Sequence, residues 1–184
     1  PVIVGGGDRG VVAACSYETR AYGVKSGMSI KMAKKRCPHA ILTKGSSGRY
    51  SEYSKPDEQV ISRLIPTLQK ASIDEFYGDI SGMGTMYDTP IELAQQIQNN
   101  IIILLGLPCS IGISVNKTMA KMASNYAKPK GLTYVVPNQE AFFLKPYPLS
   151  IIPGIGSVFE NKLHKRGFNR IYDIQVHTKA NLIR

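Results

Sequence analysis

The sequence has no tryptophan, only three cysteines and no long run of apolar residues. The cysteines, at positions 15, 37 and 109, are odd in number and far apart. This pattern argues against a disulfide framework or a zinc–thiolate site and is typical of reduced thiols inside a cell. The longest apolar run, residues 101–105, is too short to span a membrane, and no signal peptide is recognisable. We therefore expect a cytoplasmic protein with no membrane partner.

Acidic residues are also scarce. The 184 residues include 23 Lys or Arg and 13 Asp or Glu, which gives a net charge of +10. Residues 114–184 carry a net charge of +8, and residues 20–49 contain eight basic residues and no acid. Each basic run alone could be a solvated face, but a basic surface of this kind favours a phosphate-rich partner, first of all nucleic acid.

Two of the few acids, Asp74 and Glu75, are adjacent and lie in the apolar and aromatic segment SIDEFY, residues 72–77. A single straight strand would send their side chains to opposite faces of a sheet. A hairpin turn near residues 73–75 would instead bring both carboxylates to one end of the sheet. Because Mg²⁺ prefers one or two carboxylates together with substrate phosphates, the pair predicts a magnesium site. A solvated acidic turn is the alternative.

The apolar pattern alternates between strands and helices. Helices are expected over 31–36, 57–65 and 90–105, and also after the capping residues Ser16 and Asn116. Glycines within residues 5–10 indicate a hairpin turn. The fold class predicted is α+β, with one sheet covered by helices on one face. The strands expected are residues 1–4, 11–15, 109–114 and 132–136, together with a hairpin over 68–81.

Tyr17 and Arg20 are three residues apart on the helix that Ser16 is expected to cap. They therefore share one helix face. A phenol beside a guanidinium can clamp a phosphate group. The alternative is a surface tyrosine packed under an arginine.

The character of the sequence changes after Pro137. Two prolines, at 146 and 148, mark a linker, and Gly154 and Gly156 form a Gly-x-Gly turn beside two short helices expected near 158–166 and 170–174. Such a helix-hairpin-helix can bind DNA phosphates through backbone N–H groups without reading base sequence. A plain helical hairpin is the alternative. Four basic residues add positive charge here: Lys162, Lys165, Arg166 and Arg170.

Eight stretches together resemble the Y-family, lesion-bypass DNA polymerases of the DNA polymerase IV or ImpB-MucB-SamB type. Any one of them is a weak signal, but the set covers nearly the whole chain in order and is highly specific. The stretches are VVAACSYETR (11–20), GVKSGM (23–28), AKKRCP (33–38), SIDEFY (72–77), GISVNK (112–117), AKMAS (120–124), AKPKG (127–131) and PGIG (153–156).

The resemblance implies an architecture and an activity. Residues 11–65 would be small fingers, residues 1–10 and 66–145 a palm that is the catalytic core, and residues 146–184 a partial thumb with a helix-hairpin-helix. The implied reaction is template-directed addition of deoxynucleotides to a primer 3′-OH, in translesion synthesis and the tolerance or repair of DNA damage. The implied partners are primer-template DNA, an incoming dNTP and a sliding clamp contacted through a C-terminal region outside this sequence.

The resemblance also implies roles for individual residues. Asp74 would bind Mg²⁺ and Glu75 would be the adjacent catalytic and metal-binding carboxylate, with two Mg²⁺ ions in the complete enzyme. Tyr17, Arg20 and Lys128 would hold the incoming triphosphate. DNA-backbone binding is expected from the Gly154–Gly156 turn and from the basic residues Lys162, Lys165 and Arg166.

The sequence departs from the family pattern in several respects. A further metal-binding Asp and an aromatic steric gate are implied upstream of Pro1, and a little-finger domain is implied after the last residue. We therefore expect a core cut at both ends that is impaired or inactive by itself. Gly78 stands where the family usually has a bulkier apolar residue. Two other classes stay open: a non-catalytic DNA-binding module that keeps the fold, and a metal-dependent nuclease.

Overall fold

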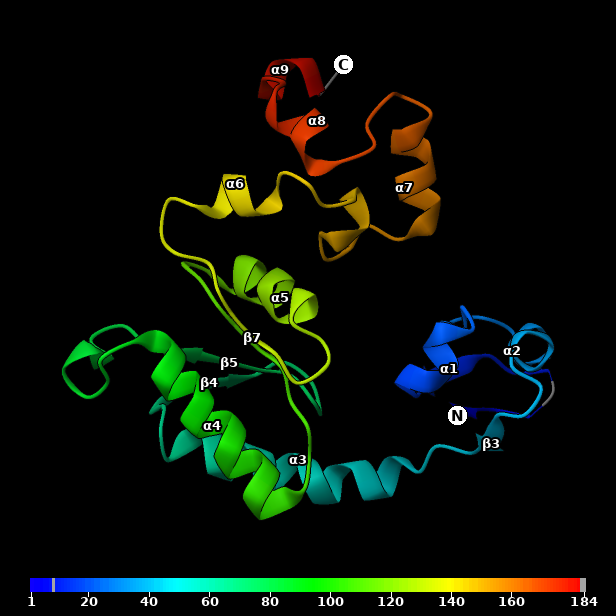
Figure 1. Cartoon of the computed structure of the whole chain (residues 1–184), viewed down its shortest axis with the longest axis horizontal. Helices are drawn as coiled ribbons and strands as arrows, with labels where there is room; N and C mark the ends of the chain where they lie inside the picture. The colour runs from blue at the N-terminus through cyan, green and yellow to red at the C-terminus, as the bar shows by residue number, and fades with distance from the viewer. Residues whose placement is uncertain (8, 183–184) are drawn as a thin grey trace. The chain divides into compact units, whose positions relative to one another are not determined.

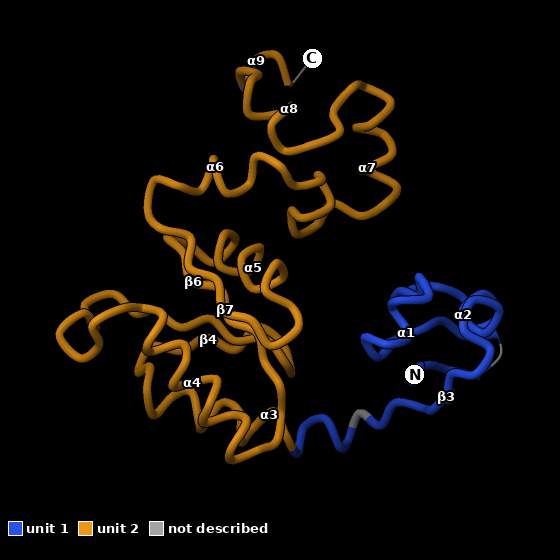
Figure 2. Tube along the Cα trace, in the orientation of Figure 1, with its two compact units in different colours: residues 1–52 blue, residues 53–184 orange. Residues whose placement is uncertain are grey.

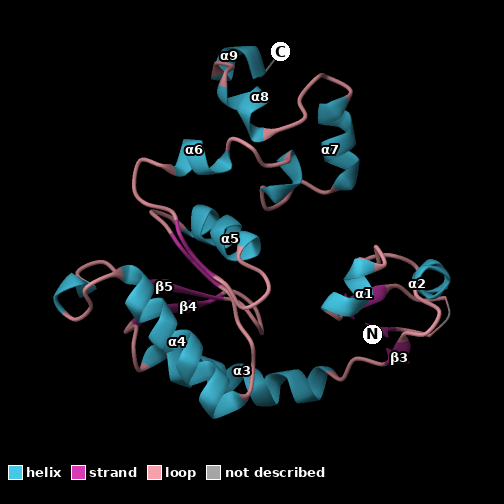
Figure 3. Ribbon diagram, in the orientation of Figure 1, coloured by secondary structure: helices cyan, strands magenta, loops and turns pink. Residues whose placement is uncertain are grey.

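The computed structural model describes residues 1–7 and 9–182 and has the mixed α+β composition that the sequence predicts (Figures 1 and 3). The chain forms two compact units, Pro1–Glu52 and Tyr53–Arg184 (Figure 2). Two predictions extend beyond the described residues: Asp8 of the turn over residues 5–10, and residues 183–184 of the expected thumb. No helix in the described part of the chain combines the length and apolar character that crossing a membrane requires.

The first unit is built on a three-stranded sheet in the order β2-β1-β3. The central strand β1 (Val2–Gly5) is antiparallel to β2 (Val12–Cys15) and parallel to β3 (Ile41–Thr43). The predicted hairpin between the first two strands is therefore confirmed. Two short helices complete the unit, α1 (Tyr17–Ala21) and α2 (Ile30–Arg36).

A small apolar core and two helix caps hold the first unit together. Ile3, Val24 and Ile30 are fully buried. Ser16 caps α1 as predicted, because its hydroxyl accepts a hydrogen bond from the Thr19 backbone N–H at 3.4 Å. The buried Thr19 hydroxyl in turn donates to the Val2 carbonyl at 3.0 Å, which ties α1 to the central strand.

The second unit contains two separate two-stranded sheets and most of the helices. Helix α3 (Ser47–Ser62) begins in the first unit and ends in the second. The antiparallel pair is β4 (Thr67–Lys70) with β5 (Phe76–Asp79), and the parallel pair is β6 (Ile111–Ile113) with β7 (Leu132–Tyr134). The other elements are η1 (Met83–Thr85), α4 (Pro90–Leu105), α5 (Lys117–Tyr126), α6 (Glu140–Leu144), η2 (Leu149–Ile151), α7 (Ser157–His164), α8 (Ile171–Gln175) and α9 (Lys179–Leu182).

Helix α4 confirms the sequence prediction at both ends. Thr89 accepts a hydrogen bond from the Glu92 backbone N–H at 3.2 Å, Pro90 is the first helical residue, and Gly106 ends the helix at a φ of 67°. The buried face of α4 carries Leu93 and Ile97, which pack in one cluster with residues of α3 and of the β4–β5 hairpin. This cluster is the main core of the second unit.

Two details of the predicted fold are wrong. The strands of the described residues form three small sheets rather than one, and each pairing extends over three or four residues. Helix α3 begins ten residues before the predicted start at residue 57. Its first ten residues, 47–56, are mostly exposed and polar and end with Pro56, so no apolar periodicity marks them in the sequence.

The subdomain boundaries named from the sequence stay a prediction. Strand pairing nevertheless joins β1 to β2 and β3, so residues 1–10 belong structurally with the rest of the first unit. The grouping of residues 1–10 with residues 66–145 was implied by the family resemblance, and the strand pairing within the first unit does not test it.

Helix α5 packs directly on strand β6 at Gly112. A Cβ atom at this position would collide with the Ala120 carbonyl oxygen and the Ser124 backbone nitrogen, both in α5. Met119, Met122 and Ala123 bury the inner face of the helix. The absence of a side chain at Gly112 therefore sets how closely α5 approaches the sheet.

We predict that Gly112→Ala destabilises the protein by at least about 2 kcal/mol, because the collision is with backbone atoms that cannot move aside individually. Urea unfolding followed by far-ultraviolet circular dichroism measures the change. Gly84→Ala is the matched control, since a Cβ atom at Gly84 meets nothing within 4 Å. Equal stability of the two variants would contradict the close approach of α5 and β6.

Candidate functional site

The turn of the β4–β5 hairpin carries the two adjacent acids. Backbone N–H groups of Ala71 and Ser72 donate to the Glu75 carbonyl at 2.9 and 3.2 Å and close the turn. Asp74 lies in this turn and Glu75 directly precedes β5. The sequence prediction of a turn near residues 73–75 is confirmed, and both acids lie at the same end of the hairpin.

Glu75 is held by two neighbours that keep it ionised. Its Oε2 pairs with the Lys121 ammonium of α5, and its Oε1 accepts a hydrogen bond from the Tyr77 hydroxyl at 2.5 Å. The Lys121 hydrogen bond, then that of Tyr77, and further the positive charges of Lys121 and Lys128, hold the pKa of Glu75 below its ordinary value. Partial burial and the Glu75 carboxylate raise the pKa of Tyr77 to about 12. At neutral pH the pair is therefore a carboxylate and a neutral phenol.

Asp74 has a different environment. Its side chain is exposed, and its Oδ1 accepts a hydrogen bond from the Ser72 hydroxyl at 2.7 Å. The Ser72 oxygen also accepts from the Asp74 backbone N–H at 3.4 Å. The short loop thus fixes the orientation of Asp74 while leaving the residue open to solvent.

Helix α5 supplies the positive charges that face this hairpin. Asn116 caps the helix by accepting from the Met119 backbone N–H at 2.9 Å, as predicted. Lys117 and Lys121 are one helical turn apart, so they share a face. Lys117 donates to the Gln69 side chain of β4, and Lys121 pairs with Glu75. Lys128 follows the helix and acts on Glu75 through its charge.

The sequence did not single out Lys121 or Tyr77 as site residues. Lys121 lies in the AKMAS stretch, and its position four residues after Lys117 was the available signal. The structure also accounts for Gly78, where the family usually has a bulkier residue. A Cβ atom at Gly78 would lie 2.8 Å from Cδ1 of Ile65, so the Ile65 side chain occupies that space.

Tyr17 and Arg20 lie side by side in the first unit. The guanidinium carbon of Arg20 is 5.2 Å from the centroid of the Tyr17 ring, and Arg20 Nε donates to the Cys15 carbonyl at 3.3 Å. Both residues are exposed. The predicted shared face is confirmed, and this geometry is compatible both with a phosphate clamp and with a tyrosine packed under an arginine.

The Gly-x-Gly turn lies between η2 and α7. Gly154 has a φ of 95°, which favours glycine, and Gly156 is the N-cap residue of α7. The Glu160 side chain of α7 accepts from the Ser150 backbone N–H of η2 at 3.0 Å, which links the two elements across the turn. The element η2 was not predicted from the sequence, since it is only three residues long. Lys162, Lys165 and Arg166 are exposed in and after α7.

The acidic pair fits a magnesium site that substrate phosphates complete. Among residues 1–7 and 9–182, no group of three or more His, Cys, Asp or Glu side chains is arranged to hold a metal ion. Two adjacent carboxylates at one turn are nevertheless the donor set that Mg²⁺ uses when phosphate oxygens and water supply the other ligands. Asp74 is exposed to solvent, whereas Glu75 already carries a positively charged partner.

We predict that Lys121→Met raises the pKa of Glu75, because removal of the cation disfavours the carboxylate. The depressed pKa of Glu75 means that its ionisation stabilises the fold above its ordinary pKa of 4.5, and that this contribution disappears as the pH falls through the folded-state value. As the pH falls from neutral through the folded-state pKa of Glu75, the Lys121→Met variant should therefore lose less stability than the parent chain.

Nuclear magnetic resonance titration of the Glu75 side-chain carboxyl carbon, in a metal-free buffer, measures this pKa. Lys117→Met is the matched control, because Lys117 lies on the same helix face but bonds the neutral side chain of Gln69. An unchanged pKa of Glu75 in Lys121→Met would show that the ion pair does not hold the carboxylate.

Comparisons of the sequence and of the structure with known proteins point to the same family. The sequence model of the impB/mucB/samB family matches residues 1–125. DNA polymerase IV of Lactococcus lactis subsp. cremoris (strain MG1363) is 41% identical over 169 residues, which are 92% of this chain and 46% of that protein. DNA polymerase IV of Listeria monocytogenes serotype 4a (strain HCC23) is 38% identical over 186 residues, which are 100% of this chain and 52% of that protein. The chain therefore spans about half the length of the curated relatives it matches.

Solved structures resemble the whole described fold. DinB from Sulfolobus solfataricus has a TM-score of 0.87 at 31% identity, over 99% of this chain and 54% of that one. The insertion ternary complex of Dbh DNA polymerase has a TM-score of 0.85 at 30% identity, over 98% of this chain and 54% of that one. Because the family model covers more than half of the sequence and these polymerases share its fold, the chain belongs to the impB/mucB/samB family of Y-family DNA polymerases.

Proposed function

We propose that this protein is a template-directed DNA polymerase of the translesion class, which transfers a nucleotidyl group from a dNTP to a primer 3′-OH. The observation that carries the proposal is the acidic turn: Asp74 and Glu75 lie at one end of the β4–β5 hairpin, with Lys121 and Lys128 acting on Glu75. Family membership supports the same conclusion, since the curated relatives are named DNA polymerase IV.

Asp74 and Glu75 are the residues proposed to hold divalent metal ions, with two Mg²⁺ expected in the complete enzyme. Bound Mg²⁺ would stabilise the attacking and leaving oxygens of an in-line displacement. The contribution of the chain itself is positional. Tyr77 and Lys121 keep Glu75 ionised and fix its carboxylate, and the Ser72 hydroxyl orients Asp74.

The phosphates of the incoming nucleotide are assigned to cationic and phenolic donors. Tyr17 and Arg20 present a phenol and a guanidinium on one helix face, which suits a triphosphate. Lys128 is proposed to bind the same phosphates, and its effect on the pKa of Glu75 supports a place near the acidic turn. Charge neutralisation of this kind is the main contribution that proteins make to phosphoryl transfer.

Primer-template DNA is the proposed macromolecular partner. The Gly154–Gly156 turn, with the exposed cations Lys162, Lys165 and Arg166, is assigned to the DNA backbone as a helix-hairpin-helix. The solved relative described as an insertion ternary complex supports a complex of more than two components. The fingers, palm and thumb boundaries and a sliding-clamp contact belong to the same proposal.

We predict that Asp74→Ala lowers Mg²⁺-dependent primer extension by more than about 100-fold, as expected when a group that positions developing charge is removed. Asp79→Ala is the matched control, since Asp79 is an exposed acid at the other end of β5.

Two outcomes would overturn parts of this proposal. Equal extension by Asp74→Ala and Asp79→Ala would remove the metal-binding role of Asp74. DNA binding by the parent chain without any extension, and without Mg²⁺-dependent dNTP binding, would favour a non-catalytic DNA-binding module.

We predict that DNA binding is independent of sequence and falls steeply with salt. Replacing Lys162, Lys165 and Arg166 together by Gln should reduce the slope of log Kd against log salt by about 0.9 for each lost phosphate contact. The control exchanges the same residues while keeping their charge, as Lys162→Arg, Lys165→Arg and Arg166→Lys. An unchanged slope in the Gln variant would exclude this surface from DNA-backbone binding.

A further inference from the structure

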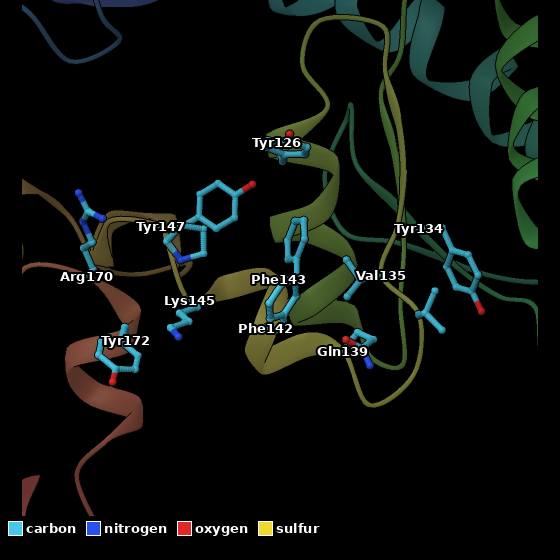
Figure 4. A pocket seen from close by; sticks show the side chains of 12 residues that line it. Tyr126, Tyr134, Val135, Gln139, Phe142, Phe143, Lys145, Tyr147, Arg170 and Tyr172 are labelled. Carbon is cyan, nitrogen blue, oxygen red and sulfur yellow. The ribbon is translucent and has the colours of Figure 1, made fainter.

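The second unit contains an open pocket of about 810 Å³ that none of the proposed catalytic residues line. Its walls come from the end of α5, from β7 and the loop that follows, from α6 and from the start of α8 (Figure 4). Its volume lies within the range of about 300–1,000 Å³ that small-molecule sites occupy. The pocket is therefore a separate feature of the molecule that polymerase chemistry at the acidic turn does not explain.

Aromatic side chains dominate this pocket. Six of the 15 Phe and Tyr residues of the chain line it. Three of them form a connected cluster, with ring centroids 5.8 Å apart for Tyr126 and Phe143, 5.6 Å for Tyr126 and Tyr147, and 5.3 Å for Phe143 and Tyr147. These contacts hold the rings of Tyr126, Phe143 and Tyr147 while leaving Tyr126 58% exposed, and the neighbouring Phe142, outside the cluster, is 75% exposed.

The charge of the pocket has one sign. Lys145 and Arg170 line it, and none of the twelve described lining residues is acidic. The Lys145 ammonium lies 4.7 Å from the centroid of the Tyr172 ring, so it is held over an aromatic face. Asp173 is the nearest acid along α8. Its carboxylate accepts hydrogen bonds from the backbone N–H groups of Asn169 and Arg170, at 2.7 and 2.8 Å, at the start of the helix.

Exposed rings beside cations are the two features that sites for single-stranded nucleic acid combine. Bases of any sequence stack on aromatic faces, and cations follow the phosphates. An apolar ligand would leave Lys145 and Arg170 without a role, and an acidic peptide would leave the exposed rings without one.

We propose that this pocket binds unpaired nucleotides of single-stranded DNA. Bases stack on Phe142 and Tyr126, and the phosphates lie near Lys145 and Arg170. The proposal goes beyond the polymerase function for two reasons. The site contains neither Asp74 nor Glu75, and its ligand is DNA that need not be base-paired with a complementary strand.

The test measures the affinity of the 184-residue chain for two oligonucleotides by fluorescence anisotropy. One is an oligothymidylate of eight nucleotides, and the other is fully abasic with the same number of phosphates. The parent should prefer the thymidylate by about tenfold or more, since stacking on an aromatic side chain contributes that much per base. Phe142→Ala should reduce this preference at least about fivefold. Phe159→Ala, which removes a half-exposed ring of α7 outside the pocket, should leave the preference unchanged.

A second pair of measurements separates the pocket from other basic surfaces. Lys145→Gln with Arg170→Gln should weaken binding of both oligonucleotides and lower the salt dependence. Photocrosslinking with 5-iododeoxyuridine, mapped by mass spectrometry, should give adducts at Tyr126, Phe142 or Tyr147.

An unchanged base preference in Phe142→Ala would overturn the proposal, as would adducts confined to residues 154–166. Asp74→Ala should keep the preference for oligothymidylate over the abasic oligonucleotide. A failure of this site can therefore be told apart from a failure of the polymerase proposal. Thermal unfolding of Phe142→Ala confirms that the variant is folded, as expected for a ring that is mostly exposed.

Discussion

The ion pair between Glu75 and Lys121 is the interaction on which the proposed site depends. Glu75 is partly buried, with 31% of its side chain exposed, and a carboxylate in that position is costly unless it is paired and hydrogen-bonded. Lys121 supplies the charge and Tyr77 a hydrogen bond. The pair also connects the hairpin to α5, which follows it by about 40 residues in the chain. A carboxylate that stays ionised and oriented is what binding of a divalent metal requires.

Lys121 reaches Glu75 because α5 packs closely on the β6–β7 sheet. The packing at Gly112 sets the distance between α5 and that sheet. With no side chain at Gly112, the backbone of α5 rests on β6, and Met119 and Met122 bury its inner face. Lys117 and Lys121 then reach Gln69 and Glu75 on the neighbouring hairpin. Apolar packing and charge pairing are thus carried by different faces of one ten-residue helix. The same helix ends at Tyr126, which lines the aromatic pocket.

Local signals in the sequence predicted much of the fold. The caps at Ser16, Thr89 and Asn116 were identified correctly, because capping depends on residues within one turn of the helix start. The hairpin turn between β4 and β5 was also predicted, since turn formation is local. The division of the strands into three small sheets and the early start of α3 were not predicted, because strand pairing and the exposed half of a helix leave no periodic apolar pattern.

The sequence by itself determined the family, the α+β class and the acids that carry the proposed chemistry, because these follow from residue identity and short spacings. Only the tertiary structure showed that Lys121 pairs with Glu75, that Ile65 fills the space at Gly78, and that six aromatic residues line one pocket beside two cations. The physical reason is the same in each case. These contacts join residues that are far apart in the chain, and their distance is set by packing, which no local pattern in the sequence encodes.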